Sequence, residues 1–405
     1  MTTMKSWNSV DLGSVVQLIN GDRGKNYPSQ KDFINDGIPF INAGHIQEGS
    51  IQFKSMNYIS QETFNLLGSG KILPNDILYC LRGSLGKTAI VQDIDKGAIA
   101  SSLVIIRPSK DITIKYLYYF LTSYLGQAEI YKHDNGSAQP NLSAASVKAY
   151  KIPLPPLEEQ KRIAAILDKA DRIRRKRQEA IRLTEELGRS IFLDMFGDPV
   201  TNPKGWEIKK LRSVIQSIDA GWSANAEERK CKEDDWGVLK VSAVTSGKFK
   251  PFENKSVGEN PNFPKPPIIP KKGDLLFSRA NTRELVAATC LVEQDYERIF
   301  LSDKLWRISI LKGLITPEYL KFLLTYQRYR DLLTKKATGT SGSMLNISQG
   351  KLLDMDAPIP DIDIQRKFSD LIWKSIEVST RIRENNKESE NLFNSLLQRA
   401  FRGEL

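Results

Sequence analysis

The sequence predicts an α+β protein: two tandem α/β domains joined by two long helices that pair as an antiparallel coiled coil. Three observations support this prediction. The second half of the chain repeats the first half in the same order, strand-like and helix-like runs are mixed within each copy, and each copy ends in a long heptad pattern. The length of 405 residues agrees with this organisation, since single domains contain about 150 residues.

The duplication is visible in four windows of sequence that keep one order. They are 7–16 with 206–215, 76–79 with 274–277, 112–122 with 315–325, and 141–163 with 346–368. In the third pair, six of the eleven positions are identical. The shift between the copies stays between 198 and 205 residues, as insertions in surface loops would cause. These windows indicate a tandem duplication.

The larger part of each copy mixes strands with a helix. Runs rich in Ile, Leu, Val and aromatic residues predict strands at 76–81, 102–106, 274–277 and 304–310. Thr316, Pro317 and Glu318 predict a helix start, because they suit the cap, the first position and the first turn. Matching apolar residues recur at helical spacing in the first copy: Leu117, Phe120, Leu121, Tyr124 and Leu125.

Proline-rich segments mark the end of this larger part in both copies. Prolines stand at 153, 155 and 156 in the first copy and at 358 and 360 in the second. The segment 261–270 contains five prolines and has no counterpart in the first copy. It predicts a loop that is specific to the second copy.

The smaller part of each copy predicts a long helix with a heptad seam. The predicted inward positions are Ile163, Ile166, Ala170, Ile173, Arg177, Ala180, Thr184, Leu187 and Ile191 in the first helix, and Phe368, Leu371, Ser375, Val378, Ile382, Asn385, Ser389, Leu392 and Leu396 in the second. Gly197 should end the first helix. Antiparallel pairing would relate the copies by a pseudo-two-fold axis. The alternative is that the two helices pack into separate cores.

The composition favours a polyanionic partner. Lys and Arg total 59 and Asp and Glu total 48, a net charge of +11, which makes nucleic acid the first candidate. The alternative is a merely basic protein. No run is long and apolar enough for a membrane helix, and the N-terminus does not resemble a signal peptide. We therefore expect a cytoplasmic protein.

Residues that build metal or catalytic centres are scarce. The three cysteines, Cys80, Cys231 and Cys290, lack zinc-site spacing. The two histidines, His45 and His133, are expected in loops or on the surface rather than in catalysis.

Three partial motifs point to no enzyme. Residues 83–88 end like a phosphate-binding loop, but Leu81 replaces the first glycine, so a turn between strands is expected. Residues 260–263 approach an amino-methyltransferase motif but lack its second proline. Residues 360–365 suggest a nuclease carboxylate pair, yet Gln365 stands where the lysine belongs. We expect no catalytic site and no metal site in this chain.

Two polar loops in each copy are the candidate DNA-binding residues. The first loop contributes Arg82, Ser84, Lys87 and Thr88, with Arg279, Asn281, Thr282 and Arg283 at the matching place in the second copy. The second loop contributes Asn135, Gln139 and Asn141, with Lys335, Lys336, Thr340 and Ser341 as its counterparts. Arginine and lysine suit guanine edges or phosphates, and asparagine suits adenine. The alternative is that these are solvated loops. The basic run 172–177 occurs in one copy only, and a solvated or partner-facing helix side is expected there.

Three segments resemble the specificity (S) subunit of type I restriction–modification enzymes. They are Gln-Pro-Asn-Leu-Ser at 139–143, Ile-Pro-Leu-Pro-Pro-Leu-Glu-Glu-Gln-Lys-Arg-Ile at 152–163, and Ser-Ile-Phe-Leu-Asp-Met-Phe-Gly-Asp-Pro at 190–199. The resemblance covers the whole chain, with a weaker match at 359–365. It divides the chain into target-recognition domain 1 (1–152), a helical region (153–199), target-recognition domain 2 (200–357) and a second helical region (358–405).

The resemblance also implies the function. Each recognition domain would read one half of a two-part site in double-stranded DNA, and the helices would fix the unread spacer. The helices would also dock two methyltransferase (M) subunits, which restriction (R) subunits then join. This chain would carry no cofactor, because S-adenosylmethionine, ATP and Mg would belong to the partner subunits. Two alternatives remain at this point: a stand-alone adenine methyltransferase with recognition domains, and a coiled-coil scaffold that does not bind DNA.

Overall fold

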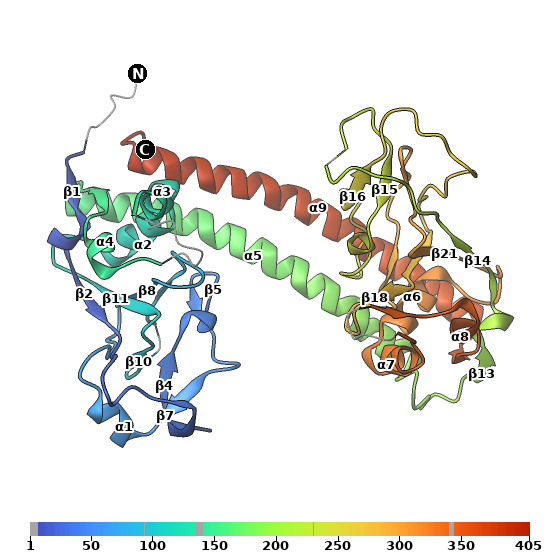
Figure 1. Cartoon of the computed structure of the whole chain (residues 1–405), viewed down its shortest axis with the longest axis horizontal. Coiled ribbons are helices and arrows are strands. Elements are labelled where there is room, and N and C mark those ends of the chain that lie inside the picture. The colour runs from blue at the N-terminus through green and yellow to red at the C-terminus, as the bar shows by residue number, and fades with distance from the viewer. Residues whose placement is uncertain (1–6, 93, 134–140, 230, 340–343) are drawn as a thin grey trace. The chain divides into compact units, whose positions relative to one another are not determined.

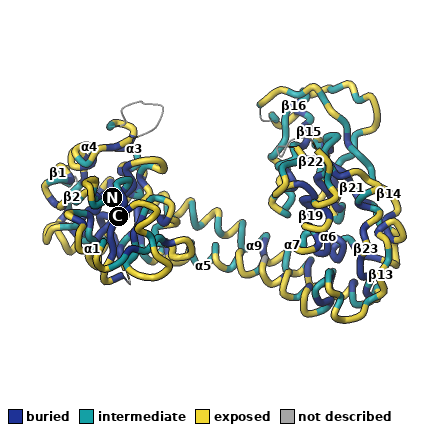
Figure 2. The backbone as a smooth tube through the Cα atoms, turned by 60° about the horizontal axis from the view of Figure 1, so that its bottom comes forward, coloured by how far each residue is buried: buried dark blue, intermediate teal, exposed yellow. Residues whose placement is uncertain are grey.

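The computed structural model describes residues 7–92, 94–133, 141–229, 231–339 and 344–405. It divides into two compact units, one made of Met1–Gln178 with Glu384–Leu405 and the other of Glu179–Arg383. Figure 1 shows that each unit contains sheets and helices, and Figure 2 shows that buried residues gather inside each unit. The predicted division into four segments follows the sequence, whereas these two units are defined by contacts in space. The four-segment division therefore stays a prediction.

The first unit is built on two four-stranded sheets. One sheet has the order β2-β11-β8-β9 and is antiparallel, and the other has the order β10-β4-β7-β3. The strands are β1 (Ser9–Asp11), β2 (Val16–Asn20), β3 (Phe33–Ile34), β4 (Ile38–Ile41), β5 (Ile46–Gln47), β6 (Ser50–Ile51), β7 (Asn57–Ile59), β8 (Ile77–Cys80), β9 (Thr88–Ile90), β10 (Ala98–Ile99), β11 (Leu103–Pro108) and β12 (Lys151–Pro153).

Short helices surround these sheets, and one long helix comes after them. They are η1 (Leu12–Ser14), η2 (Gln30–Asp32), η3 (Ala43–His45), α1 (Gln61–Leu66), α2 (Ile114–Thr122), α3 (Tyr124–His133), α4 (Ala144–Lys148) and α5 (Leu157–Phe196). Pairing of β1 with β12 closes the globular part just before α5 begins.

The central strands β8 and β11 explain why the sequence is so apolar at these places. Tyr79 and Ile106 face a core shared with α2 and α5, whereas Leu78 and Ile105 face a second core on the other side. A strand buried on both faces is apolar at every position instead of alternating. The strands predicted at 76–81 and 102–106 are confirmed.

The second unit repeats the main sheet of the first, while its other sheet has three strands in the order β16-β15-β20. Its main sheet has the order β14-β21-β17-β19, which corresponds to β2-β11-β8-β9. The elements are β13 (Glu207–Lys210), η4 (Leu211–Ser213), β14 (Ile215–Ala220), β15 (Gly237–Leu239), η5 (Val241–Ala243), β16 (Asn254–Ser256), β17 (Leu275–Ser278), β18 (Ala280–Asn281), β19 (Thr289–Leu291), β20 (Ile299–Phe300), β21 (Leu305–Ile310), α6 (Pro317–Thr325), α7 (Gln327–Lys335), β22 (Leu345–Asn346), α8 (Gln349–Leu353), β23 (Asp356–Ile359) and α9 (Ile362–Phe401). The tandem duplication is confirmed.

A buried glutamine joins each globular part to its long helix in the same way. The Gln160 side chain accepts a hydrogen bond from the Thr113 amide (2.8 Å) and donates to the carbonyls of Asp111 (3.0 Å) and Pro155 (2.9 Å). Gln365 bonds the amide of Thr316 and the carbonyls of Leu314 and Pro360 at the matching places. Both glutamines are 0% exposed. The register between the two copies is therefore correct at the start of each long helix.

The predicted helix boundaries and the proline loop also agree with the structure. The Thr316 hydroxyl accepts a hydrogen bond from the Tyr319 amide, and α6 begins at Pro317. The first long helix ends at Phe196, and Gly197 comes next with a φ of +78°. The segment 261–270 contains no helix or strand.

The long helices run antiparallel within each unit. In the first unit, Ile163 and Leu167 near the start of α5 share a core with Leu397 and Phe401 near the end of α9. In the second unit, Phe192 near the end of α5 contacts Phe368 near the start of α9, with ring centroids 5.8 Å apart. The antiparallel pairing is confirmed, and it also places the helix ends in the cores of the globular parts.

The predicted heptad seam is wrong at six positions. Ile163 and Phe368 are buried as predicted, and Ile166, Ile191, Ile382 and Leu396 are half-buried. The prediction fails at Asn385, which is exposed, and at five apolar positions with exposed fractions between 42% and 59%: Ile173, Leu187, Leu371, Val378 and Leu392. Buried side chains at neighbouring positions include Ile372, Ser379 and Leu397. The cause is that the ends of each long helix bury the face that contacts the globular core. A heptad pattern considers only the contact between the two helices.

The two histidines lie in different surroundings. His45 is 4% exposed, accepts a hydrogen bond from the Asn42 amide at Nδ1 and lies 3.0 Å from the Ser55 carbonyl at Nε2. The expectation of a loop or surface histidine is therefore wrong for His45, which is structural. His133 is half-exposed and stacks on Tyr150.

Within the described ranges, no helix combines the length and apolar character that crossing a membrane requires.

Candidate nucleic-acid interface

The loop 81–87 of the first copy is a hairpin turn between β8 and β9. Gly83 and Gly86 have φ values of +79° and +75°, a conformation that L side chains rarely adopt. A Cβ on Gly86 would also lie 2.4 Å from the Ile130 side chain. Because a strand and not a helix comes after the loop, it cannot cradle phosphates as a nucleotide-binding loop does, and the predicted turn is confirmed.

The structure brings two of the predicted DNA-binding residues together. Arg82 forms an antiparallel bridge with Asn141, and the Leu142 amide donates to the Leu81 carbonyl (2.9 Å). Both Arg82 and Asn141 are exposed. They line a hollow of about 180 Å³, together with Asn20, Arg23, Leu81, Leu142, Ser143 and Ala144. The hollow presents donors and acceptors of the kind that read base edges.

Two residues of this hollow, Asn20 and Arg23, were missed by the sequence reasoning. They flank the end of β2, and the signal for them is a glycine-flanked polar loop directly after a strand, 21–24. The Asp22 carboxylate fixes this loop by accepting hydrogen bonds from the amides of Gly24 and Gly68, both at 2.7 Å. These bonds hold the pKa of Asp22 below its ordinary value.

The structure contradicts one predicted residue of this loop. Thr88 lies on β9 with an exposed fraction of 4%, and its hydroxyl donates to the Gly86 carbonyl (2.8 Å). A buried hydroxyl with a partner inside the fold does not face DNA. Ser84 and Lys87 are exposed, and their role stays a prediction.

The matching place in the second copy requires a correction. Here β18 pairs with β22, with Ala280 opposite Asn346, and the Ile347 amide donates to the Arg279 carbonyl (2.8 Å). Since Leu81 and Arg82 hold these positions in the first copy, Arg279 corresponds to Leu81 and not to Arg82. The two arginines stand six and five residues after the matching aspartates, so the residue-for-residue match breaks between them.

Arg279 also makes a different contact. Its Nε donates to the Asp303 carbonyl (2.9 Å), and its guanidinium lies 3.9 Å from the Asp303 carboxylate. Consecutive residues of an extended segment point to opposite faces, so the one-position offset turns this side chain toward Asp303. Arg279 is half-buried and braces the β18 segment.

The remaining candidates of the second copy lie around this segment. Arg283 is exposed, while Asn281 and Thr282 are half-buried, and the Asn281 side chain accepts a hydrogen bond from the Thr282 amide (2.9 Å). Lys335 and Lys336 are exposed at the end of α7. Four predicted residues lie outside the described residues: Asn135, Gln139, Thr340 and Ser341.

The basic run 172–177 is largely engaged inside the first unit. Asp171, with an exposed fraction of 7%, holds the guanidinium groups of Arg174 and Arg175. Arg177 donates to the Asn385 carbonyl and to the Ser389 hydroxyl on α9. These pairs leave Arg172 and Lys176 as the exposed cations of the run, so the run does not form a continuous DNA-binding face.

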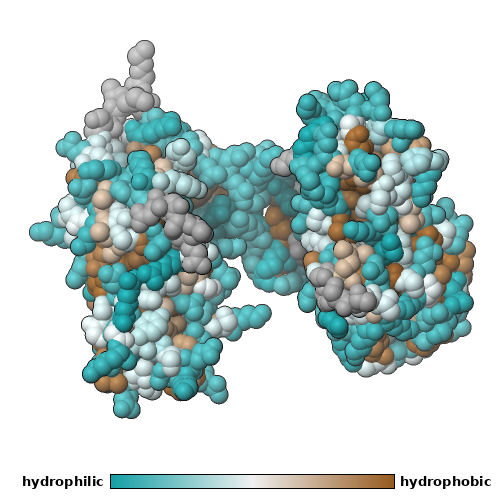
Figure 3. Space-filling model, in the orientation of Figure 1, coloured by the Kyte–Doolittle hydropathy of each residue, from teal (hydrophilic) through white to brown (hydrophobic). Residues whose placement is uncertain are grey.

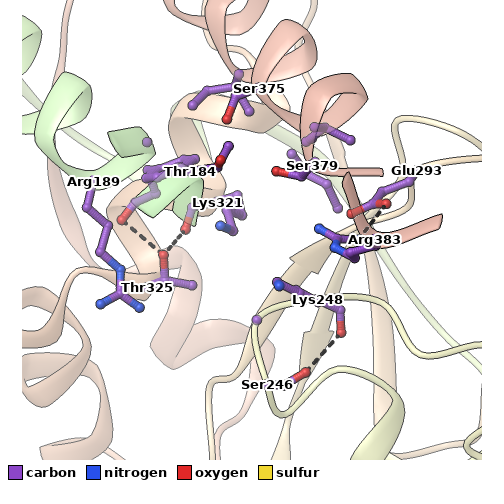
Figure 4. A pocket seen from close by; sticks show the side chains of 16 residues that line it. Thr184, Arg189, Ser246, Lys248, Glu293, Lys321, Thr325, Ser375, Ser379 and Arg383 are labelled. Carbon is purple, nitrogen blue, oxygen red and sulfur yellow. Dashed lines mark hydrogen bonds and ion pairs between the residues drawn. The ribbon is translucent and has the colours of Figure 1, made fainter. Parts of the chain in front are cut away.

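A separate cavity of about 150 Å³ lies in the second unit between α5, α6, α9 and the loop 246–248. Figure 4 shows Lys321, Lys248 and Arg383 around it, with Arg383 3.6 Å from the Glu293 carboxylate. Its charged residues are one acid, Glu293, and four cations, and the acid is paired with Arg383. In the described residues, no group of three or more His, Cys, Asp or Glu gathers as a metal site would.

Comparisons with known proteins agree with this geometry. The profile of a family described as the type I restriction modification DNA specificity domain matches residues 4–183. The specificity subunit of the type I restriction enzyme EcoEI from Escherichia coli is 33% identical over 186 residues, covering 46% of this chain and 31% of that relative. The specificity subunit of EcoKI from Escherichia coli strain K12 is 24% identical over 424 residues, covering 99% of this chain and 89% of that relative.

A solved structure extends the likeness to the fold of the whole chain. The S subunit of a type I restriction–modification system from M. genitalium aligns with 99% of this chain and 97% of its own length, with a TM-score of 0.59 and 14% identity. The family profile assigns residues 4–183 to the type I restriction modification DNA specificity domain, and the second half of the chain repeats the main sheet of that domain.

Proposed function

We propose that this chain is a specificity subunit that reads a two-part site in double-stranded DNA, and that each of its two compact units reads one half in the major groove. One observation supports this most directly. Both copies build the same junction, in which the chain after β8 or β17 pairs with the segment before α4 or α8. Arg82 pairs with Asn141 in the first copy, and Ala280 pairs with Asn346 in the second. The backbone pairing is the same in both copies, whereas the side chains differ, as expected for two domains that read different DNA sequences.

The chemistry of the exposed side chains supports base reading. Arg82 and Arg283 suit bidentate bonds to guanine, and Asn141 suits bonds to adenine. The net charge of +11 supports attraction to the phosphate backbone. A coiled-coil scaffold without DNA binding would need none of these loop residues, and it is the less favoured alternative.

The long helices are proposed as the ruler and the docking surface. They fix the unread spacer between the half-sites, and they bind two M subunits, which R subunits then join. Exposed apolar side chains on these helices support docking, among them Ile173, Leu187, Leu371, Val378 and Leu392. On the face drawn in Figure 3, hydrophilic residues otherwise dominate the surface of each unit.

Cofactors belong to the partners in this proposal. S-adenosylmethionine would be bound by the M subunits and ATP and Mg by the R subunits, and the assembly would act on DNA in the cytoplasm of a prokaryotic cell. A stand-alone adenine methyltransferase is less favoured, because residues 260–263 lack the second proline of that motif. Calorimetric titration of the isolated chain with S-adenosylmethionine separates the two, and we expect no heat of binding.

Methylation mapping tests the proposal. The chain is produced with its M subunit in a host that lacks adenine methylation, and the methylated sequence is read from genomic DNA. We expect a two-part sequence with an unread gap. Arg82→Ala should relax bases in one half only, whereas the exposed control Glu158→Ala should change nothing. Equal weakening at every sequence would instead make Arg82 a phosphate contact.

A further inference from the structure

The loop 279–288 of the second copy lacks the glycines that shape the loop 81–87 of the first copy. In the first copy, β8 ends at Cys80 and β9 starts at Thr88, and two glycines with positive φ make the turn. In the second copy the segment 279–288 between β17 and β19 is three residues longer and contains no glycine. Ala287 adopts a φ of +65° instead, a conformation that persists only when its surroundings hold it.

Arg330 on α7 provides a brace from outside this segment. Its Nη2 donates to the carbonyls of Glu284 (2.6 Å) and Val286 (2.9 Å), and its Nε lies 3.2 Å from the same Val286 carbonyl. Val286 is 0% exposed and belongs to the core of the second unit. The planar guanidinium suits such a fork, since it presents several donors in fixed directions.

We infer that Arg330 is a positioning residue for reading of the second half-site, and that it acts by fixing the backbone that carries Arg283. This inference rests on the proposed function. Arg283 is exposed and stands directly before Glu284, whose carbonyl Arg330 holds. Base reading needs a side chain placed to within a fraction of an ångström. The bond from the Val286 amide to the Thr282 carbonyl (2.8 Å) closes a turn around Arg283, and Arg330 ties that turn to α7.

Arg330 itself is engaged with the protein. Burial lowers the pKa of its guanidinium, because the charge is taken from water and faces carbonyl dipoles. A cation used in this way orders the loop and does not contact a phosphate.

The first copy provides an internal comparison. Gln127 stands at the matching place, with the same shift of 203 residues that relates α2 to α6. Its side chain donates to the Leu121 carbonyl at the end of α2 (2.9 Å) and not to the loop 81–87. The brace is therefore specific to the second copy, and its loss should affect one half-site only.

The test compares Arg330→Gln, which installs the residue of the first copy, with Arg330→Lys, which keeps the charge but not the fork. Each variant is assembled with the M subunit, and methylation is measured on duplexes that carry single changes in either half-site. We expect discrimination in the second half to fall about fivefold or more for Arg330→Gln, with the first half unchanged. Arg330→Lys should be intermediate.

A double variant tests whether Arg330 acts by positioning Arg283 or by weakening DNA binding in general. If Arg330 acts through Arg283, the double variant Arg283→Ala with Arg330→Gln should discriminate no worse than Arg283→Ala alone. The slope of binding against salt should be unchanged in Arg330→Gln. Gln327→Ala controls for loosening of α7, because Gln327 is exposed and bonds only Asp331 of the same helix among the described contacts, and it should leave both halves unaltered.

Three results would overturn the inference: unchanged discrimination in Arg330→Gln, equal losses in both halves, or additive effects in the double variant. If Arg330→Gln does not fold, the same comparisons are made with Arg330→Lys. Failure of the proposed function is distinguishable, because the wild-type chain would then show no two-part sequence at all.

Discussion

Matched deletions in the two long helices should shorten the unread gap of the DNA site. Each helix has 40 residues and is about 60 Å long at about 1.5 Å per residue. Removing 176–182 from α5 and 381–387 from α9, positions related by the shift of 205, takes out the polar middle of both helices. One heptad shortens each helix by about 10 Å, which equals about three base pairs. It changes the helix phase by only about 20°, so the buried ends keep their faces.

Methylation mapping of this variant is the assay. We expect a gap shortened by about two or three base pairs, with lower methylation because the half-sites rotate by roughly 100° around the DNA axis. Five-residue deletions at 177–181 and 382–386 are the control, because five residues turn the helix by about 140° out of phase. They should abolish methylation. An unchanged gap in the seven-residue variant would refute the ruler.

Three further outcomes are expected from the structure. The chain alone should bind DNA weakly and with steep salt dependence, a slope of about −4 in log K against log salt for four phosphate contacts, whereas a flat response by fluorescence anisotropy would exclude contact through the basic loops. Gln160→Ala should destabilise the chain by about 2–4 kcal/mol in urea unfolding, because a fully buried side chain loses three hydrogen bonds, while the exposed Glu158→Ala should leave stability unchanged. The depressed pKa of Asp22 means that its bonds to Gly24 and Gly68 stabilise the loop at neutral pH and are lost as pH falls through that pKa. The two amide NMR signals should therefore shift together below pH 3.8, and independent titration of the two would contradict the shared carboxylate.

The sequence predicted the framework well because the framework repeats. Identities such as Gln160 with Gln365 mark positions where one buried hydrogen-bond set is needed twice. Thr316 and Gly197 mark helix ends through local chemistry that needs no tertiary contact. The strands β8 and β11 were predictable because burial on both faces makes them continuously apolar.

The recognition loops and the helix seam were predicted less well, for physical reasons. The match of Arg82 with Arg279 failed because a change in loop length moves side chains to the other face. Thr88 looked polar and available, but its partner lies two residues away in the turn. Ile173 was placed inward because the heptad rule counts one partner helix, whereas the globular core competes for the buried face. Arg330 was missed because its role depends on carbonyls 44 and 46 residues away.

A chain with two copies of one recognition domain tests the central claim most directly. Residues 9–153 replace 208–358, exchanging the parts closed by the strand pairs β1–β12 and β13–β23. The chimera is assembled with the M subunit, and its complex is purified before methylation mapping. We predict a methylated sequence with two identical, inverted halves and the wild-type gap, and the reciprocal chimera should give the other inverted repeat. A methylated sequence identical to that of the wild-type chain would contradict the claim that each unit reads its own half of the site.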